Sequence, residues 1–120
     1  MKELYEGMTA RDVRLLGDGD FADGHLSVTT VHLACEMACH NILAAQFDED
    51  DTSLGIRNDI WFWGEAKPGD LLHAEAMVAR VDGSRIVFNV FARAGLHEIA
   101  RGVHERKLVS KSRFTAALKS

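Results

Sequence analysis

The stretch VHLACEMACHNILAAQF, residues 31–47, decides the fold, because it is apolar around almost its whole circumference when wound as a helix. A helix that is apolar on every side has to be buried. Thr29 and Thr30 offer N-caps in front of it, and the acidic run at residues 48–51 would oppose the helix dipole at the other end. We therefore expect one buried helix that begins near residue 31 and ends before residue 48.

Glu36 stands at the centre of this apolar helix. Burying an unpaired charge costs several kcal/mol, and a small domain has only about 5–15 kcal/mol of stability in total. The carboxylate therefore reaches solvent, is paired, or serves a function. His32 and His40 lie four residues to either side and share its stripe of the helix, so each is a candidate partner. The two histidines are about 12 Å apart along the axis, too far for both to bind one ion at about 2 Å, and we expect no metal.

The chain after the helix changes its hydrophobic period from about 3.6 residues to 2, which is typical of strands. Asn58, Ile60 and Phe62 then share one face of the first strand, and Trp61 and Trp63 share the other, in the sheet core or a dimer interface. Turn signals at 67–70, 82–84 and Gly95 separate the strands. The expected strands are residues 53–66, 71–81, 85–94 and 98–110, followed by a polar tail at 113–120.

The N-terminal 30 residues give a weaker pattern, with a loop at 17–25 between two short strand-like segments, 12–16 and 25–28. Strands joined by short turns pair antiparallel, and a helix that is apolar all round needs a sheet that curls about it. We expect an α+β chain of the hotdog type, with residues 1–120 as a single hotdog domain: a curved antiparallel sheet of about five strands wrapped around one long buried helix. The open edge of such a sheet favours a homodimer, or a homotetramer made of two dimers.

Composition excludes several classes of protein. The net charge is −4 and there is no basic run, so we expect no nucleic-acid partner. No apolar run approaches the roughly 20 residues of a membrane span, and no secretory signal is visible, so we expect a cytoplasmic protein that does not bind a membrane. Cys35 and Cys39 should pack as small apolar side chains in that reducing compartment.

Three parts of the chain resemble a known family: the helix around Glu36, the stretch TSLGIRNDIWFWGEAKPGD that begins at residue 52, and VDGSRIVFNVFARAGLHEIARGVHERKLV, which ends at residue 109. The most specific features are SLG, seventeen to nineteen residues after the helical Glu, and the G-x-H-E-R sequence at 102–106. Over about residues 26–114 the chain resembles hotdog-fold acyl-CoA thioesterases, and most closely the fluoroacetyl-CoA thioesterase-like group.

This resemblance implies an acyl-CoA thioester hydrolase, with Glu36 as general base or nucleophile. It implies that the backbone N–H of Gly55 binds the oxyanion and that Arg106 assists, for example by binding a CoA phosphate. The family's catalytic Thr and His positions fall on Val28, with Thr29 beside it, and on Phe62, so these three become candidate substrate-binding residues. Coenzyme A is part of the substrate, and no other cofactor is implied.

Three more polar residues join the candidate site. Asn58 shares the face of Phe62 and is a candidate to bind a carbonyl or to orient water, so we place it with the catalytic residues. His104 shares the face of Arg106 at a spacing of two, and His32 lies on the stripe of Glu36. Both are candidates for substrate binding.

Two other functions remain open. The unmatched Thr and His positions favour a hotdog protein that binds an acyl-CoA or a hydrophobic or aromatic ligand without cleaving it. In either case the phenyl ring of Phe62 predicts a pocket that is more apolar than the family's. A hotdog hydratase or dehydratase is the third alternative, and no local feature of the sequence supports it.

Overall fold

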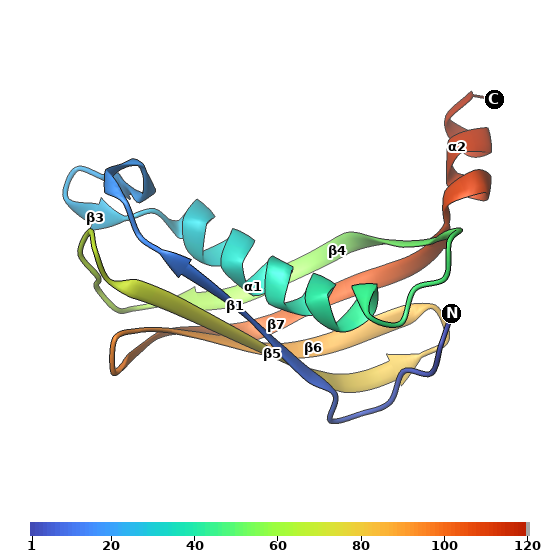
Figure 1. Cartoon of the computed structure of the whole chain (residues 1–120), viewed down its shortest axis with the longest axis horizontal. Coiled ribbons are helices and arrows are strands. Elements are labelled where there is room, and N and C mark those ends of the chain that lie inside the picture. The colour runs from blue at the N-terminus through green and yellow to red at the C-terminus, as the bar shows by residue number, and fades with distance from the viewer. Residues whose placement is uncertain (120) are drawn as a thin grey trace.

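The computed structural model describes residues 1–119 and shows a curved sheet with one long helix lying across it (Figure 1). The strands and helices expected for an α+β chain are all present. In chain order the elements are β1 (Thr9–Leu15), the 3-10 turn η1 (Asp18–Asp20), β2 (Phe21–Ala22), β3 (His25–Leu26), α1 (Val28–Ala44), β4 (Asp51–Phe62), β5 (Leu71–Asp82), β6 (Arg85–Ala94), β7 (His97–Ser110) and α2 (Lys111–Lys119).

The main sheet is antiparallel and has five strands in the order β1-β5-β6-β7-β4. The four strands expected after the helix are confirmed, and the fifth comes from the N-terminal segment, where β1 pairs with β5. The hairpin expected at Asp82–Gly83 joins β5 to β6, with Gly83 in the left-handed region at φ +61°. The two edges of the sheet are therefore β1 and β4.

The core lies between α1 and the inner face of the sheet. On α1, the side chains at the buried positions are mostly small, which lets the helix axis lie close to the strands. Cys35 and Cys39 are free and fully buried, as expected, and burial raises the pKa of Cys35 to about 12. Phe88 on β6 is the largest fully buried side chain. Buried positions alternate along β6 at Ile86, Phe88, Val90, Ala92 and Ala94.

The helix begins earlier than we expected, at Val28, with Ser27 as its N-cap residue in place of Thr29 or Thr30. The hydroxyl of Thr30 instead donates a hydrogen bond of 3.1 Å to Asp20 in the preceding 3-10 turn. The C-terminal end at Ala44, ahead of the acidic run, agrees with the expectation.

The polar tail expected at 113–120 was wrong for its described part, because Lys111–Lys119 form α2, which projects away from the sheet in Figure 1. Asp50 holds the start of this helix. It accepts hydrogen bonds from the backbone N–H of Ser112 at 3.0 Å and from the Ser112 hydroxyl at 2.9 Å. Asp50 lies 62 residues earlier in the chain, so the local pattern gave no sign of the cap. Residue 120 lies outside the described part.

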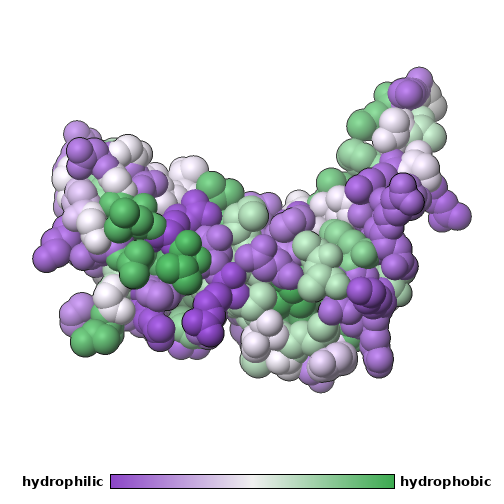
Figure 2. All heavy atoms as spheres, viewed as in Figure 1, coloured by the Kyte–Doolittle hydropathy of each residue, from purple (hydrophilic) through white to green (hydrophobic). Residues whose placement is uncertain are grey.

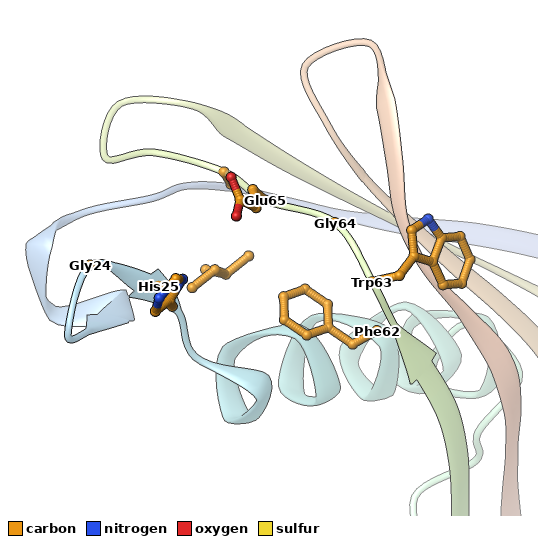
Figure 3. A pocket seen from close by; sticks show the side chains of 8 residues that line it. Gly24, His25, Phe62, Trp63, Gly64 and Glu65 are labelled. Carbon is orange, nitrogen blue, oxygen red and sulfur yellow. The ribbon is translucent and has the colours of Figure 1, made fainter.

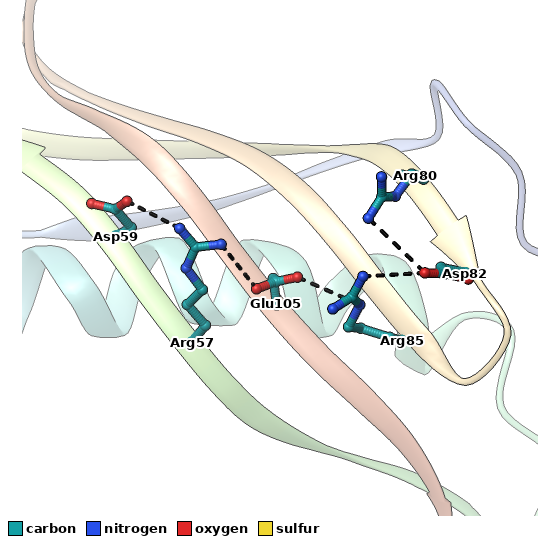
Figure 4. Close-up of polar contacts among 6 residues, drawn as sticks. All are labelled: Arg57, Asp59, Arg80, Asp82, Arg85 and Glu105. Atoms are coloured by element: carbon teal, nitrogen blue, oxygen red, sulfur yellow. Dashed lines mark hydrogen bonds and ion pairs between the residues drawn. The ribbon is translucent and has the colours of Figure 1, made fainter.

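The outer face of the sheet carries a row of ion pairs (Figure 4). Glu105 on β7 contacts Arg57 on β4 at 3.3 Å and Arg85 on β6 at 3.7 Å, and so connects three strands. Trp61 lies on this side of β4 and is 74% exposed, and Trp63 is also exposed. Neither tryptophan is in the sheet core, which was one of the two expectations for them.

On the helix side, hydrophobic side chains gather beside β3 and the N-terminal half of α1, with hydrophilic side chains around them (Figure 2). In the first two turns of α1, Val28 and Leu33 are about half exposed. This end of the helix therefore presents an apolar surface that hydrophilic side chains surround.

Gly102 allows β4 to approach β7 closely. A Cβ atom at this position would lie 2.1 Å from the carbonyl oxygen of Asp59 and 2.6 Å from Cα of Ile60. Both of these atoms belong to the backbone of β4, which has no flexible end that could move aside. Since β4 also carries Gly55 and Asn58, Gly102 determines where those residues lie.

We expect Gly102→Ala to lower the free energy of unfolding by about 1–3 kcal/mol or more, because the added methyl group forces the two strands apart. Urea unfolding measures this difference. Gly19→Ala is the matched control, since a Cβ atom at Gly19 meets nothing within 4 Å, and its effect should stay within about 0.5 kcal/mol. Equal effects of the two substitutions would contradict the role given to Gly102.

Candidate active site

Glu36 pairs with an arginine from the sheet. Its Oε1 accepts a hydrogen bond of 3.0 Å from Nη1 of Arg106 on β7, and the carboxylate side chain remains 38% exposed. The side chains of His32 and His40, the candidate partners on its own helix, form no hydrogen bond with the Glu36 carboxylate among residues 1–119. The helix therefore carries its acid in a half-buried position where one oxygen is held and the other, Oε2, has no protein partner in the described chain.

Arg106 is enclosed and fully engaged. It is 7% exposed. Its Nε donates to the Ser53 hydroxyl at 2.8 Å, and its Nη2 donates to the Ser53 carbonyl at 3.2 Å. Its Nη1 also donates to Nε2 of His104 at 3.2 Å. These bonds fix the plane of the guanidinium group, so its orientation toward Glu36 is set by β4 and β7 together.

His104 lies between Arg106 and Asn58 and is 1% exposed. Its Nδ1 is 2.5 Å from Oδ1 of Asn58. A guanidinium group can only donate, so Nε2 is the acceptor and Nδ1 carries the proton that bonds the Asn58 oxygen. Burial, and then the charge of Arg106, lower the pKa of His104 below its ordinary 6.5. The ring is therefore neutral at pH 7.

Gly55 closes this cluster on the β4 side. A Cβ atom there would lie 3.3 Å from both Nη1 of Arg106 and Oε1 of Glu36, and 3.4 Å from Cε1 of His104. The ladder between β4 and β7 shifts register between Gly55 and Arg57. This bulge changes which residues face inward, so that Ser53, Gly55 and then Asn58 all lie on the helix side.

Phe62 lines a separate cavity of about 310 Å³ at the end of β4. In Figure 3 its ring points into this space, His25 and Glu65 lie at the border, and the Trp63 side chain points away. The cavity lies between the β2–β3 hairpin and the segment that follows β4. Its lining residues are Gly24, His25, Leu26, Phe62, Trp63, Gly64, Glu65 and Ala66.

The structure brings together five of the residues named from the sequence: Glu36, Gly55, Asn58, His104 and Arg106. It places Phe62 at the cavity instead, and it places Val28 and Thr29, both exposed, in the first turn of α1. His32 is half-buried one turn before Glu36. None of these four forms a side-chain hydrogen bond to the cluster among residues 1–119.

Ser53 is the member of the site that we did not identify from the sequence. It is the first residue of the SLG sequence, and its hydroxyl and carbonyl both bind Arg106. Within residues 1–119, no three His, Cys, Asp or Glu side chains lie close enough together to hold a metal ion. The same part of the chain contains no helix that is both long and apolar enough to cross a membrane.

The lowered pKa of His104 predicts how stability depends on pH. The unfolded chain takes up a proton near pH 6.5, whereas the folded ring takes it up only at lower pH. The unfolded state therefore binds more protons in this window, and the free energy of unfolding should fall as pH decreases below about 6.5. Urea unfolding from pH 5 to 8 measures this slope, and His104→Gln, which lacks the titrating ring, should show a smaller one. Equal slopes in the two proteins would contradict this assignment.

The chain is similar to known thioesterases in sequence and in fold. A curated relative, the fluoroacetyl-CoA thioesterase of Streptantibioticus cattleyicolor, is 29% identical over 84 residues, which are 70% of this chain and 60% of the relative's length. The solved structure of the fluoroacetyl-CoA thioesterase FlK superposes with a TM-score of 0.89 at 20% identity, over 98% of this chain and 97% of that one.

A thioesterase-superfamily protein from Thermus thermophilus superposes with a TM-score of 0.91 at 19% identity, over 99% of this chain and 93% of the other. These likenesses confirm the hotdog fold expected from the sequence. The family model described as fluoroacetyl-CoA-specific thioesterase matches residues 9–112, nearly the whole chain. The chain therefore belongs to the fluoroacetyl-CoA-specific thioesterase family of hotdog proteins.

Proposed function

We propose that this protein hydrolyses an acyl-CoA thioester and that Glu36 carries the reaction. The observation that supports this most directly is the half-exposed carboxylate of Glu36, held through one oxygen by the enclosed Arg106. Its free oxygen can remove a proton from water or attack the thioester carbonyl. Family membership supports thioester hydrolysis as the class of reaction.

Two groups on β4 complete the chemistry. Gly55 has no side chain to block its backbone, so a carbonyl oxygen can approach its N–H and receive a hydrogen bond as negative charge develops. Asn58 uses Oδ1 to accept from His104, which leaves its amide Nδ2 to donate to a carbonyl or to a water molecule. Both residues lie on the side of Glu36 that remains open in the single chain.

The cavity at Phe62 is the acyl subsite in this proposal. The Phe62 ring, at the position where the resemblance places the family's histidine, gives this subsite an apolar wall opposite His25 and Glu65, and a space of about 310 Å³ has room for a hydrophobic or aromatic acyl group. Structures of the related FlK enzyme contain acetyl-CoA, or fluoroacetate together with CoA. Coenzyme A is thus the carrier in our proposal, and Val28, Thr29 and His32 lie along the helix between the subsite and Glu36.

Arg106 has a different role from the phosphate contact suggested by the resemblance. Its guanidinium group is enclosed and has all its protein partners on the inner face, so we assign it to holding Glu36. Other basic residues of β4 and β7 could bind a CoA phosphate, but Arg57 is paired with Asp59 and Glu105, and Arg101 with Glu98. The exposed Lys107 is free of such pairs in the described chain.

We also propose a homodimer formed through β4. This strand has twelve residues, lies at an edge of the sheet and exposes Ile56 by 50%. A long edge strand that is not charged along its whole length favours pairing with another strand. Antiparallel pairing of two β4 strands would cover the open side of the site around Gly55 and Asn58. The free, buried cysteines support a reducing location such as the cytoplasm.

A second candidate function is binding without hydrolysis. Val28 and Phe62 stand where the family has two catalytic side chains, so this observation favours a protein that recognises an acyl-CoA or an apolar ligand through the Phe62 cavity. The two functions differ in turnover, which the following experiment measures.

Glu36→Gln should lower kcat/KM for the best acyl-CoA about 100-fold or more, since an amide neither accepts the proton nor attacks the carbonyl. The assay follows thiol release from a panel of short aliphatic, long aliphatic and aromatic acyl-CoAs. Glu98→Gln, on the outside of the sheet, is the matched control. Full activity of Glu36→Gln would rule out the role of Glu36, and tight binding with no turnover across the panel would favour the binding protein.

Ile56→Lys should shift the protein from dimer to monomer, because it places a charge on the edge that pairs in our proposal. Sedimentation equilibrium measures the mass. Val13→Lys is the control, since Val13 is a similarly exposed apolar residue (45%) on the opposite edge strand, β1. A wild-type monomer at micromolar concentration would show that the proposed dimer is wrong.

A further inference from the structure

The proposed reaction gives no role to His104, which is almost completely buried beside Arg106. A line of hydrogen bonds runs from Oδ1 of Asn58 to Nδ1 of His104, from Nε2 of His104 to Nη1 of Arg106, and from the same Nη1 to Oε1 of Glu36. His104 is too enclosed to reach a substrate itself. Its contact with the reacting carboxylate passes through Arg106.

Protonation of His104 would break this line. An imidazolium ring has no lone pair, so Nε2 could no longer accept from Arg106. It would instead present an N–H and a positive charge to a guanidinium atom 3.2 Å away, inside a site shielded from solvent. Arg106 would turn from its present plane, and Glu36 would lose the bond that orients it.

The residue type at position 58 agrees with this need for a neutral His104 ring. An amide oxygen fixes the tautomer with the proton on Nδ1 and adds no net charge. A carboxylate in the same place would attract a second proton to the ring and so favour the imidazolium form. Asn58 thus holds His104 in the one state that can accept from Arg106.

We propose that Asn58 and His104 are a positioning pair, whose neutral imidazole fixes Arg106 and thereby Glu36, so that the reaction requires an unprotonated His104. The inference rests on the proposed thioester hydrolysis, with Glu36 as the reacting group. It gives His104 a role distinct from the substrate contact expected from the sequence.

The groups that face His104 act in opposite directions, and those that favour the neutral state dominate. From β4, a hydrogen bond with the backbone of Arg57 favours protonation, but it does not outweigh burial and Arg106. From its own strand, Arg106 disfavours a second positive charge, and Glu105 favours it weakly from the outer face. From α1, Glu36 also favours protonation, but less than burial and Arg106 oppose it. From β6, the ring of Phe88 lies 6.3 Å away, centroid to centroid, and carries no charge. The Cys39 thiol, near Arg106 and Glu36, stays protonated because burial raises its pKa.

Asn58→Asp tests the pair. The new carboxylate should raise the pKa of His104 by at least about one unit and move the acid limb of the kcat/KM profile upward by the same amount. At pH values well below the acid limb of the wild type, the variant should therefore lose about tenfold more of its pH 8 activity than the wild type. Asn89→Asp is the matched control, because Asn89 is exposed on β6 opposite Val103, which faces away from His104. It should leave the limb unchanged.

Two-dimensional NMR of isotope-labelled histidine and arginine gives a readout that does not depend on activity. In the wild type, the Arg106 side-chain signals should change in the same pH range in which His104 titrates. If the Arg106 signals do not change in the pH range in which His104 titrates, the inference is wrong. This result needs only the wild-type protein. In Asn58→Asp, a raised His104 pKa with an unmoved acid limb would overturn it as well.

The test separates this inference from the proposed function. If the wild type cleaves no acyl-CoA, the proposed function fails, and the NMR titration still decides whether His104 controls Arg106. If the wild type is active and Glu36→Gln is inactive, the proposed function stands, and the acid limbs of Asn58→Asp and Asn89→Asp decide the positioning role. If the acid limb moves equally in both variants, the shift is a general effect of the added negative charge, and the positioning role of Asn58 and His104 is rejected.

Discussion

The pairing of Glu36 with Arg106 is the interaction on which the rest of the site depends. Glu36 lies in the middle of a mostly apolar helix and is only partly exposed, so the part of its carboxylate that is removed from water needs a partner, because burying a charge without compensation costs several kcal/mol. The helix does not supply that partner. It comes from β7, 70 residues later in the chain, and it brings Ser53, His104 and Asn58 into the same cluster.

Close contact between β4 and β7 makes this cluster possible. Gly102 lets the two backbones approach, the row of ion pairs through Glu105 ties the strands together on the outer face, and the bulge after Gly55 resets which side chains face the helix. The G-x-H-E-R sequence therefore carries three separate functions on alternate faces of one strand. Its glycine sets the strand spacing, its glutamate links strands on the outer face, and on the inner face its arginine binds Glu36 while its histidine binds that arginine.

By the resemblance drawn from the sequence, Glu36, Gly55 and Arg106 match the family's acid, glycine and arginine, whereas Val28 and Phe62 stand at its two remaining catalytic positions. The structure separates these two groups of residues in space. The retained residues form the hydrogen-bonded cluster, whereas Phe62 lines the cavity at the far end of β4. The replacement therefore changes the chemistry of the cavity and leaves the support of Glu36 intact. In the proposed function, such a site combines the carboxylate of Glu36 with a cavity that Phe62 makes less polar than a histidine would.

The sequence by itself determined the buried helix, the four strands after it and the face shared by Asn58, Ile60 and Phe62, because these follow from local periodicity. The sequence also identified Glu36, Gly55 and Arg106 as candidate site residues through their motifs. The spacing of these motifs did not show which residues contact one another. Tertiary structure decided the rest. The fifth strand, the capping of α2 by Asp50, the part played by Ser53 and the line from Asn58 to Glu36 all depend on contacts between residues 46 to 70 positions apart. Such contacts depend on which strands lie side by side, and a pattern of neighbouring residues carries no information about that.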